Sequence, residues 1–409
     1  MRFLVLALGL FLFTMAAFAG KASAKVAEPV VVARTAVLMD LKTGQVLYAK
    51  EPEERMYPAS TTKILTALVV LQNVRLDDCV TASKEAVNTG GSAIWVREGE
   101  KLAVSDALYA LLLNSANDVA LALAEKVSGS EKEFVALMNS TARACGATDS
   151  HFTNAHGLPD ENHYTTALDL ARITRVAMGN RVFREIVATR TKNITRPSPE
   201  DLNLLINHNK LLWNYEGAIG VKTGYTTQAG QCLVAAARRG ERELVAVVLG
   251  SEGRNVWTDA ASLLDYGFSA YRLMPLLRAG EVVGELEVFR GVKPLTLEAA
   301  QSVWYNLPVT DDALNLPFWK LLLRPVEAPV RKGQSVGEII FQDGRGEIGR
   351  FSVIAGNDVA RTPWWPVVLR GILYAGGALF GLFILLVVAG RRSRRRRTMF
   401  SRRSNPYKF

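Results

Sequence analysis

An apolar run near the C-terminus, 367–389, constrains the fold of this chain more than any other stretch. It is uncharged except for Arg370 near its start, and about 20 apolar residues are enough for a helix to cross a lipid bilayer. Trp364 and Trp365 lie at one end, as at a membrane interface, and the arginine-rich segment 391–397 lies at the other. A buried core helix is the alternative, but the length and the unequal flanks favour a transmembrane helix.

The distribution of charge indicates how such a helix would be oriented. The chain has 49 basic and 39 acidic residues, and nine of the basic ones lie in the segment 391–409, which has no acidic residue. The rest of the chain is close to neutral, so no nucleic-acid partner is expected. Because basic residues favour the cytoplasmic side of a span, we expect 391–409 in the cytoplasm and everything before the span outside.

The N-terminus agrees with export. Arg2 precedes the apolar run 3–18, and small-residue cleavage sites follow at 17–19 and 22–24. This pattern is typical of a signal peptide over 1–24, with an uncleaved anchor as the alternative.

The metal-binding and redox residue types are sparse. Three cysteines, Cys79, Cys145 and Cys232, are too few and too scattered for a disulfide framework; we expect buried thiols, with one bridge as the alternative. The four histidines lack the spacing and partners of a zinc site, so no metal and no cofactor are expected.

The pattern of apolar residues predicts an α+β domain. Strand-like runs at 35–40 and 45–49 predict a hairpin, and helical spacing follows at 60–71, 105–113 (with Ser105 as a cap) and 119–127. Strands return at 220–225, 231–237 and 243–250, before a helix at 257–270. Strands at both ends of a mainly helical region indicate one sheet with a helical insertion.

Beyond Tyr271 short alternating segments separated by glycines predict a small all-β domain, with a clear hairpin signal at 341–346. The expected organisation is a signal peptide (1–24), a catalytic domain (25–272), a β-rich domain (273–362), a transmembrane helix (366–390) and a basic cytoplasmic tail (391–409).

Three short motifs follow one another in the exported part of the chain. They are Ser60-x-x-Lys63 at a helix start, Ser115-Ala116-Asn117 between two helices and Lys222-Thr223-Gly224 on a strand. Alone, the first is more often a helix cap with a surface lysine, and the second a plain turn. In this order and context they are the signature of penicillin-binding proteins and class A β-lactamases.

Longer stretches of sequence indicate which family within this group the chain resembles. Residues 57–63, 154–158 with 165–171, and 207–213 before 221–226 resemble the serine-type D-alanyl-D-alanine carboxypeptidases, the low-molecular-mass penicillin-binding proteins. The resemblance covers about 36–270, and the β-rich segment is similar to the family's C-terminal domain. It implies a β-lactamase/penicillin-binding-protein-like fold and an enzyme that removes the terminal D-alanine from peptidoglycan pentapeptides. It also implies acylation by β-lactam antibiotics.

The resemblance implies three catalytic residues. Ser60 is the nucleophile that attacks the carbonyl between the two D-alanines. Lys63, if desolvated and near Lys222, has a lowered pKa and accepts the serine proton. Ser115 suits a proton shuttle to the leaving nitrogen. We therefore expect Lys63 to be buried and paired with both Ser60 and Ser115.

Five more residues are expected to bind the substrate. Asn117 offers a donor and an acceptor to its amide backbone, Lys222 and Thr223 hold its terminal carboxylate, and Gly224 allows a close approach. By resemblance, the backbone N–H groups of Ser60 and Tyr225 hold the oxyanion. The family often has histidine where this chain has Tyr225, which we expect to tune substrate preference.

Two other functions compete with this hypothesis. A β-lactamase of class A needs a carboxylate in the pattern E-x-x-L-N, and Glu200-Asp201-Leu202-Asn203 is one residue short of it and close to the third motif. A non-catalytic, membrane-anchored wall-binding protein with the same fold would not need Ser60, Lys63 or Lys222. The sequence therefore favours the carboxypeptidase.

Overall fold

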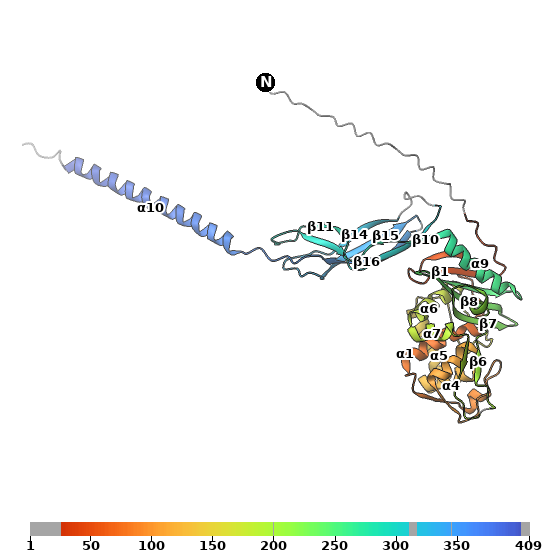
Figure 1. Cartoon of the computed structure of the whole chain (residues 1–409). Helices are drawn as coiled ribbons and strands as arrows, with labels where there is room; N and C mark the ends of the chain where they lie inside the picture. The colour runs from red at the N-terminus through yellow and green to blue at the C-terminus, as the bar shows by residue number, and fades with distance from the viewer. Residues whose placement is uncertain (1–25, 199, 311–316, 345, 402–409) are drawn as a thin grey trace, which may run out of the picture. The chain divides into compact units, whose positions relative to one another are not determined.

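The computed structural model of the chain describes residues 26–198, 200–310, 317–344 and 346–401, so the expected signal peptide and the last eight residues lie outside the described residues. The described chain forms two compact units (Figure 1). The first comprises 26–276 with 304–310, and the second 277–303 with 317–401. The stretch 304–310 thus packs with the first unit, whereas the sequence had suggested one division near residue 272.

A five-stranded antiparallel sheet forms the centre of the first unit. Its strand order is β2 (Val46–Lys50), β1 (Thr35–Asp40), β9 (Arg242–Ser251), β8 (Gly230–Arg239) and β7 (Ala218–Thr226). The chain leaves the sheet after β2 and returns at β7, and the segment between them holds most of the helices. The predicted α+β domain, one sheet with a helical insertion, is confirmed.

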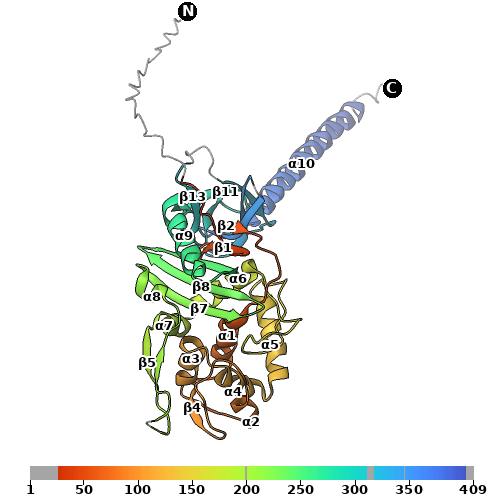
Figure 2. The same cartoon turned by 90° about the vertical axis from the view of Figure 1, so that its right-hand side faces the viewer.

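Both faces of this sheet are covered, which explains the nearly continuous apolar sequence of β8 and β9. Along β9, Val245, Val247 and Leu249 join the core on the side of the inserted helices. Leu244, Ala246 and Val248 alternate with them and pack toward α9 (Asn255–Ala270) on the other side (Figure 2). Since side chains alternate across a strand, a strand that is buried on both faces needs apolar residues at every position.

The described residues of the inserted segment form a 3₁₀ turn, eight helices and two small two-stranded sheets. The helical elements are η1 (Ala59–Thr62), α1 (Lys63–Asn73), α2 (Lys84–Val87), α3 (Val104–Leu113), α4 (Asn117–Ser128), α5 (Glu131–Ala144), α6 (Ala167–Gly179), α7 (Arg181–Ala188) and α8 (Leu211–Asn214). The small sheets pair β3 (Cys79–Thr81) with β4 (Lys101–Ala103), and β5 (Thr191–Asn193) with β6 (Leu204–Ile206), each pair antiparallel. From Ile64 to Val70 every residue of α1 is buried, as expected of a helix that is apolar all round.

The second unit is built on strands, as predicted. Its five-stranded sheet has the order β11 (Val282–Leu286), β12 (Leu295–Ala299), β16 (Gly346–Ala355), β15 (Ser335–Asp343) and β14 (Phe318–Leu323). The expected hairpin at 341–346 joins β15 to β16. A separate two-stranded sheet, nearly all of which belongs to the first unit, pairs β10 (Tyr271–Leu277) with β13 (Val303–Pro308).

One long helix, α10 (Trp365–Ser401), ends the described chain. Its part from Trp365 to Arg392 has 28 residues, and the most apolar 18-residue stretch within it has a mean hydropathy of 2.5, so it is a candidate membrane span by length and composition. The helix continues into the arginine-rich segment, which the sequence had suggested as a separate tail.

Several helix starts differ from prediction. Helices α1 and α9 begin at Lys63 and Asn255, where Ser60 and Trp257 had been expected. Ser105 does not cap α3, which begins at Val104 with no side-chain hydrogen bond at its N-terminus. Helix α4 begins at Asn117, two residues earlier than expected. In addition, all three cysteines are free thiols, and only Cys232 is buried.

Candidate active site

Ser60 lies on the 3₁₀ turn η1, directly before α1. The hydroxyls of Thr61 and Thr62 donate to the carbonyl oxygens of Pro58 (2.6 Å) and Ala59 (2.8 Å), which tightens this turn. Ser60 caps no helix. Because residues i and i+3 eclipse in a 3₁₀ turn, Lys63 is brought over Ser60.

Lys63 is fully buried, and its Nζ has three hydrogen-bond partners. Its Nζ lies within hydrogen-bond distance of Ser60 Oγ, at 3.1 Å, and donates to Asn117 Oδ1 and to the backbone oxygen of His156, both at 2.6 Å. The expected burial and the contact with Ser60 are present. The other two partners, however, are Asn117 and His156, where a pairing with Ser115 had been expected.

Burial lowers the pKa of both buried lysines. Burial lowers the pKa of Lys63 well below its ordinary value, and the nearby charge of Lys222 lowers it further, against a smaller opposing effect of Asp118. Burial also lowers the pKa of Lys222, to about 7. Lys222 is thus poised to change charge near neutral pH, and burial favours the neutral form of Lys63.

Ser115 and Asn117 lie at the junction of α3 and α4. Ser115 has the left-handed φ of +62°, and among the described residues its buried Oγ has no hydrogen-bond partner. Asn117 bonds at three points, because its Nδ2 donates to Gly90 O (2.7 Å) and its backbone N–H donates to Ser92 O (2.7 Å) while its Oδ1 accepts from Lys63. The amide of Asn117 therefore connects the lysine to the loop at 88–99.

The third motif lies on the edge strand β7, alongside η1. A Cβ atom at Gly224 would lie 2.9 Å from Ser60 N and 3.1 Å from Pro58 O, so only glycine lets the strand approach the serine this closely. Lys222 is buried, Thr223 is half-buried, and the side chain of Tyr225 is largely exposed. The structure thus gathers Ser60, Lys63, Asn117 and the strand of Lys222 around one point.

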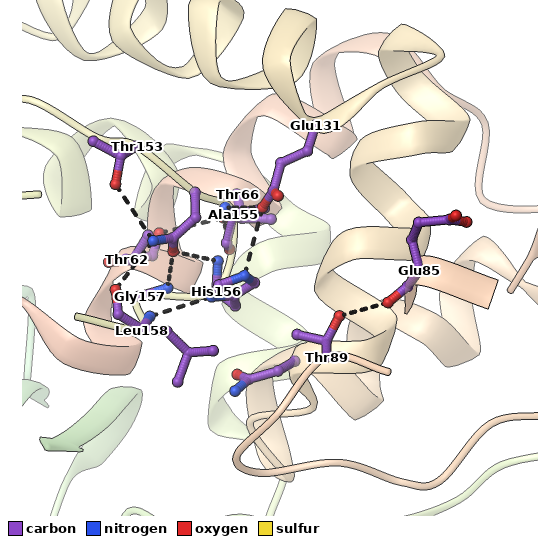
Figure 3. A network of polar contacts seen from close by, with 12 residues as sticks. Thr62, Thr66, Glu85, Thr89, Glu131, Thr153, Ala155, His156, Gly157 and Leu158 are labelled. Atoms are coloured by element: carbon purple, nitrogen blue, oxygen red, sulfur yellow. Dashed lines mark hydrogen bonds and ion pairs between the residues drawn. The ribbon is translucent and has the colours of Figure 1, made fainter. Parts of the chain in front are cut away.

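The loop 153–158 presents the His156 carbonyl to Lys63, and Figure 3 shows how it is held. The Glu131 carboxylate at the start of α5 accepts from the Ala155 N–H (3.0 Å), and Thr66 donates to Ala155 O (2.6 Å). The side chain of Asn154 accepts from the N–H groups of His156 and Gly157. A carboxylate, an amide and a hydroxyl therefore fix the carbonyl that binds the lysine.

His163 contacts η1, the 3₁₀ turn that carries Ser60, through the side chain of Thr62. Thr153 N–H donates to His163 Nδ1 (3.1 Å), so the proton is on Nε2, which contacts Thr62 Oγ1 at 2.9 Å. Thr62 in turn donates to the oxygen of Ala59, whose φ is +49°. Burial lowers the pKa of His163 to about 4, which keeps the ring neutral.

The sequence did not predict the contacts of His156 and His163, which it considered as metal ligands and discounted. Their contacts come from a loop about a hundred residues beyond Ser60, and the signal in the sequence was that His156 lies in the segment 154–158 that carries the family resemblance. Among the described residues no group of three or more His, Cys, Asp or Glu could hold a metal ion. Glu200 is exposed, and the neighbouring Asp201 pairs with Arg97.

Comparison with known proteins agrees with this geometry. A family model described as D-alanyl-D-alanine carboxypeptidase matches residues 22–253, and one described as penicillin-binding protein 5, C-terminal domain, matches 271–361. The D-alanyl-D-alanine carboxypeptidase DacF of Bacillus subtilis is 32% identical over 87% of this chain and 94% of its own length. The carboxypeptidase DacC of Escherichia coli is 34% identical over 81% and 85%.

A solved structure agrees as well. Penicillin-binding protein 5 from Haemophilus influenzae matches with a TM-score of 0.71 and 29% identity, over 82% of this chain and all of that one. The expected fold, with its C-terminal β domain, is therefore confirmed, as is the expectation of a serine hydrolase. This chain belongs to the D-alanyl-D-alanine carboxypeptidase family and is a penicillin-binding carboxypeptidase of that family.

Proposed function

We propose that Ser60, Lys63 and Ser115 carry the chemistry of this carboxypeptidase and that Asn117 and Lys222–Tyr225 bind its substrate. The substrate is a peptidoglycan pentapeptide that ends in D-Ala-D-Ala, and β-lactam antibiotics acylate the same serine. The observation that carries the proposal is the set of hydrogen bonds around the buried Nζ of Lys63.

These bonds suit a neutral amine that acts as a base. A neutral amine has two N–H donors and one lone pair. Asn117 Oδ1 and His156 O are both acceptors, at 2.6 Å, and they take up the two N–H bonds. The lone pair is then left for the third neighbour, the Ser60 hydroxyl. Lys63 can therefore accept the serine proton.

The reaction then has two halves. Ser60 Oγ attacks the carbonyl carbon of the penultimate D-alanine while its proton passes to Lys63 Nζ. The tetrahedral intermediate collapses, the C–N bond breaks, and the proton held by Lys63 passes through Ser115 to the leaving nitrogen, which makes Lys63 neutral again; the Oγ of Ser115 is unpartnered among the described residues. Water then attacks the acyl-serine, Lys63 takes its proton, and that proton returns to Ser60.

Binding would use the strand β7. Lys222 in its charged form and the Thr223 hydroxyl hold the terminal carboxylate of the substrate. The Ser60 N–H, next to Gly224, and the Tyr225 N–H hold the oxyanion, at about 3 kcal/mol of transition-state stabilisation per donor. Arg254, exposed at the start of α9, is not needed for this arrangement.

Labelling and product release test these roles. The full-length protein in detergent is incubated with fluorescent penicillin, and D-alanine release is measured with a pentapeptide ending in D-Ala-D-Ala. We expect Ser60→Ala to abolish both, and Lys63→Met to reduce acylation at least a thousandfold, with unchanged penicillin binding before acylation. Labelling and release that persist in Ser60→Ala overturn the assignment. Rapid turnover of penicillin by the wild type would instead favour a β-lactamase.

We also propose that α10 crosses the membrane once, with the catalytic unit outside and the C-terminus in the cytoplasm. The support is a 28-residue apolar helix, with tryptophans at its start and arginines at its end. The proposal includes the organisation expected from the sequence: a catalytic domain (25–272), a β-rich domain (273–362), a transmembrane helix (366–390) and a cytoplasmic tail (391–409). Protease added to intact spheroplasts should digest the catalytic unit and spare a tag placed after residue 409; digestion of the tag would reverse the orientation.

A further inference from the structure

Trp95 is an unusual residue in the loop between α2 and β4. Its side chain is largely open to solvent, with 73% of the residue exposed, although tryptophan normally buries most of its surface. Its backbone has a φ of +56°, a left-handed conformation that bulky residues rarely adopt. Such strain persists only where the surroundings enforce it, and it concentrates at functional positions.

The surroundings of Trp95 do enforce it. Asp118, which is buried, accepts hydrogen bonds from the N–H groups of Ile94 (3.4 Å) and Val96 (3.1 Å). Arg196 donates to the oxygen of Ile94 (2.7 Å) and to that of Trp95 itself (3.1 Å).

Arg196 is in turn fixed by a buried ion pair with Glu100 at 2.8 Å. Two buried charged side chains therefore hold the backbone on both sides of an exposed ring. The indole is presented to solvent from a rigid support, so little conformational entropy is lost when something binds to it.

The residues that hold the backbone of Trp95 are connected to the reaction centre through Asp118. Asp118 follows Asn117 in the chain, and Asn117 bonds both Lys63 and, through its backbone N–H, the oxygen of Ser92. Trp95 is three residues beyond Ser92, at most about 11 Å along an extended chain. The ring is therefore carried by the same loop that Asn117 ties to the reaction centre.

The substrate extends well beyond the reaction centre. In a pentapeptide cut after its fourth residue, four residues separate the reacting carbonyl carbon from the attached sugar, about 13 Å when extended. The apolar face of a sugar ring packs well on the flat, amphipathic face of an indole. We propose that Trp95 is a subsite for the amino sugar that carries the stem peptide, so that the enzyme distinguishes glycan-linked from free pentapeptide. This inference rests on the proposed function.

A comparison of two substrates tests it. D-alanine release by the full-length protein in detergent is measured with a disaccharide-pentapeptide and with the free pentapeptide of the same sequence. We expect Trp95→Ala to lower kcat/KM about threefold to tenfold for the disaccharide form and less than twofold for the free peptide. Trp95→Phe should keep most of the preference. Trp213→Ala, which removes another exposed tryptophan, of α8, is the matched control and should alter neither value.

Each other outcome overturns the subsite. Equal losses on both substrates mean that Trp95 shapes the reaction centre, and no loss on either means that the ring binds nothing. Losses that appear only in proteoliposomes, and on both substrates, assign the ring to the lipid surface. Failure of the proposed function is distinct, because the wild type would then release D-alanine from neither substrate.

Discussion

The close contact between strand β7 and the serine turn can be tested by adding a single methyl group at Gly224. A Cβ there would lie 2.9 Å from Ser60 N, 3.1 Å from Pro58 O and 3.1 Å from Ala59 Cβ, whereas ordinary contacts begin at 3.4 Å. Because two of these neighbours are backbone atoms, the turn has to move by about half an ångström. The backbone of Gly224 is not in the left-handed region, so alanine adds no conformational strain.

The size of the effect follows from the position of the contact. A displacement of about 1 Å at a reacting group costs about a hundredfold in rate. The displacement of about half an ångström expected here should therefore slow acylation at least tenfold, which corresponds to about 1.4 kcal/mol in activation free energy. The loss approaches a hundredfold if the Ser60 N–H also turns away from the oxyanion.

The assay is the second-order rate constant for acylation by fluorescent penicillin, measured beside kcat/KM for D-alanine release and the thermal unfolding temperature. Gly179→Ala is the matched control, since a Cβ at the end of α6 meets nothing within 4 Å, and it should leave all three values unchanged. If Gly224→Ala acylates within twofold of wild type and unfolds at the same temperature, the contact does not position Ser60 and the reasoning is refuted.

Three further predictions concern buried charges. Since Lys63 must be neutral and Lys222 charged, kcat/KM should follow a bell-shaped pH profile that falls as pH rises through about 7, and Lys222→Arg should move this basic limb to higher pH. His163 binds its proton near pH 6.5 when unfolded but near 4 when folded, so the unfolded state takes up more protons between these values. The free energy of unfolding should therefore decrease as pH falls from about 6.5 to 4, by on the order of 3 kcal/mol, and urea titrations of His163→Gln should show a shallower decrease. Glu100→Leu leaves the buried charge of Arg196 unpaired and should cost about 3–5 kcal/mol in the same titrations; a cost below 1 kcal/mol would contradict the buried pairing.

Local patterns predicted most of the framework, because side-chain alternation and helical spacing depend on near neighbours. The hairpin of β1 and β2, the strands β7 to β9 and the hairpin of β15 and β16 all lie where the sequence predicted them. Predictions of helix starts were weaker. Ser60 was expected at an ordinary helix start, but it lies on a 3₁₀ turn whose preceding residue, Ala59, has a left-handed φ.

That turn depends on a distant contact. Gly157 packs so closely on it that a Cβ would lie 1.9 Å from Ala59 O. No pattern within a few residues of Ser60 contains this information. The same holds for Trp95, whose strained backbone is held by Asp118 and Arg196 from two other parts of the chain.

The sequence by itself determined which reactive groups are available and the order in which they occur. Ser60 and Lys63 are three residues apart, and turn geometry alone brings them together. The tertiary structure decided what Lys63 is chemically. Its acceptors come from 54 and 93 residues away, and its lowered pKa arises from burial and from Lys222 on another strand. Desolvation and through-space charge depend on what surrounds a group and not on its neighbours in the chain, so the base exists only in the folded protein.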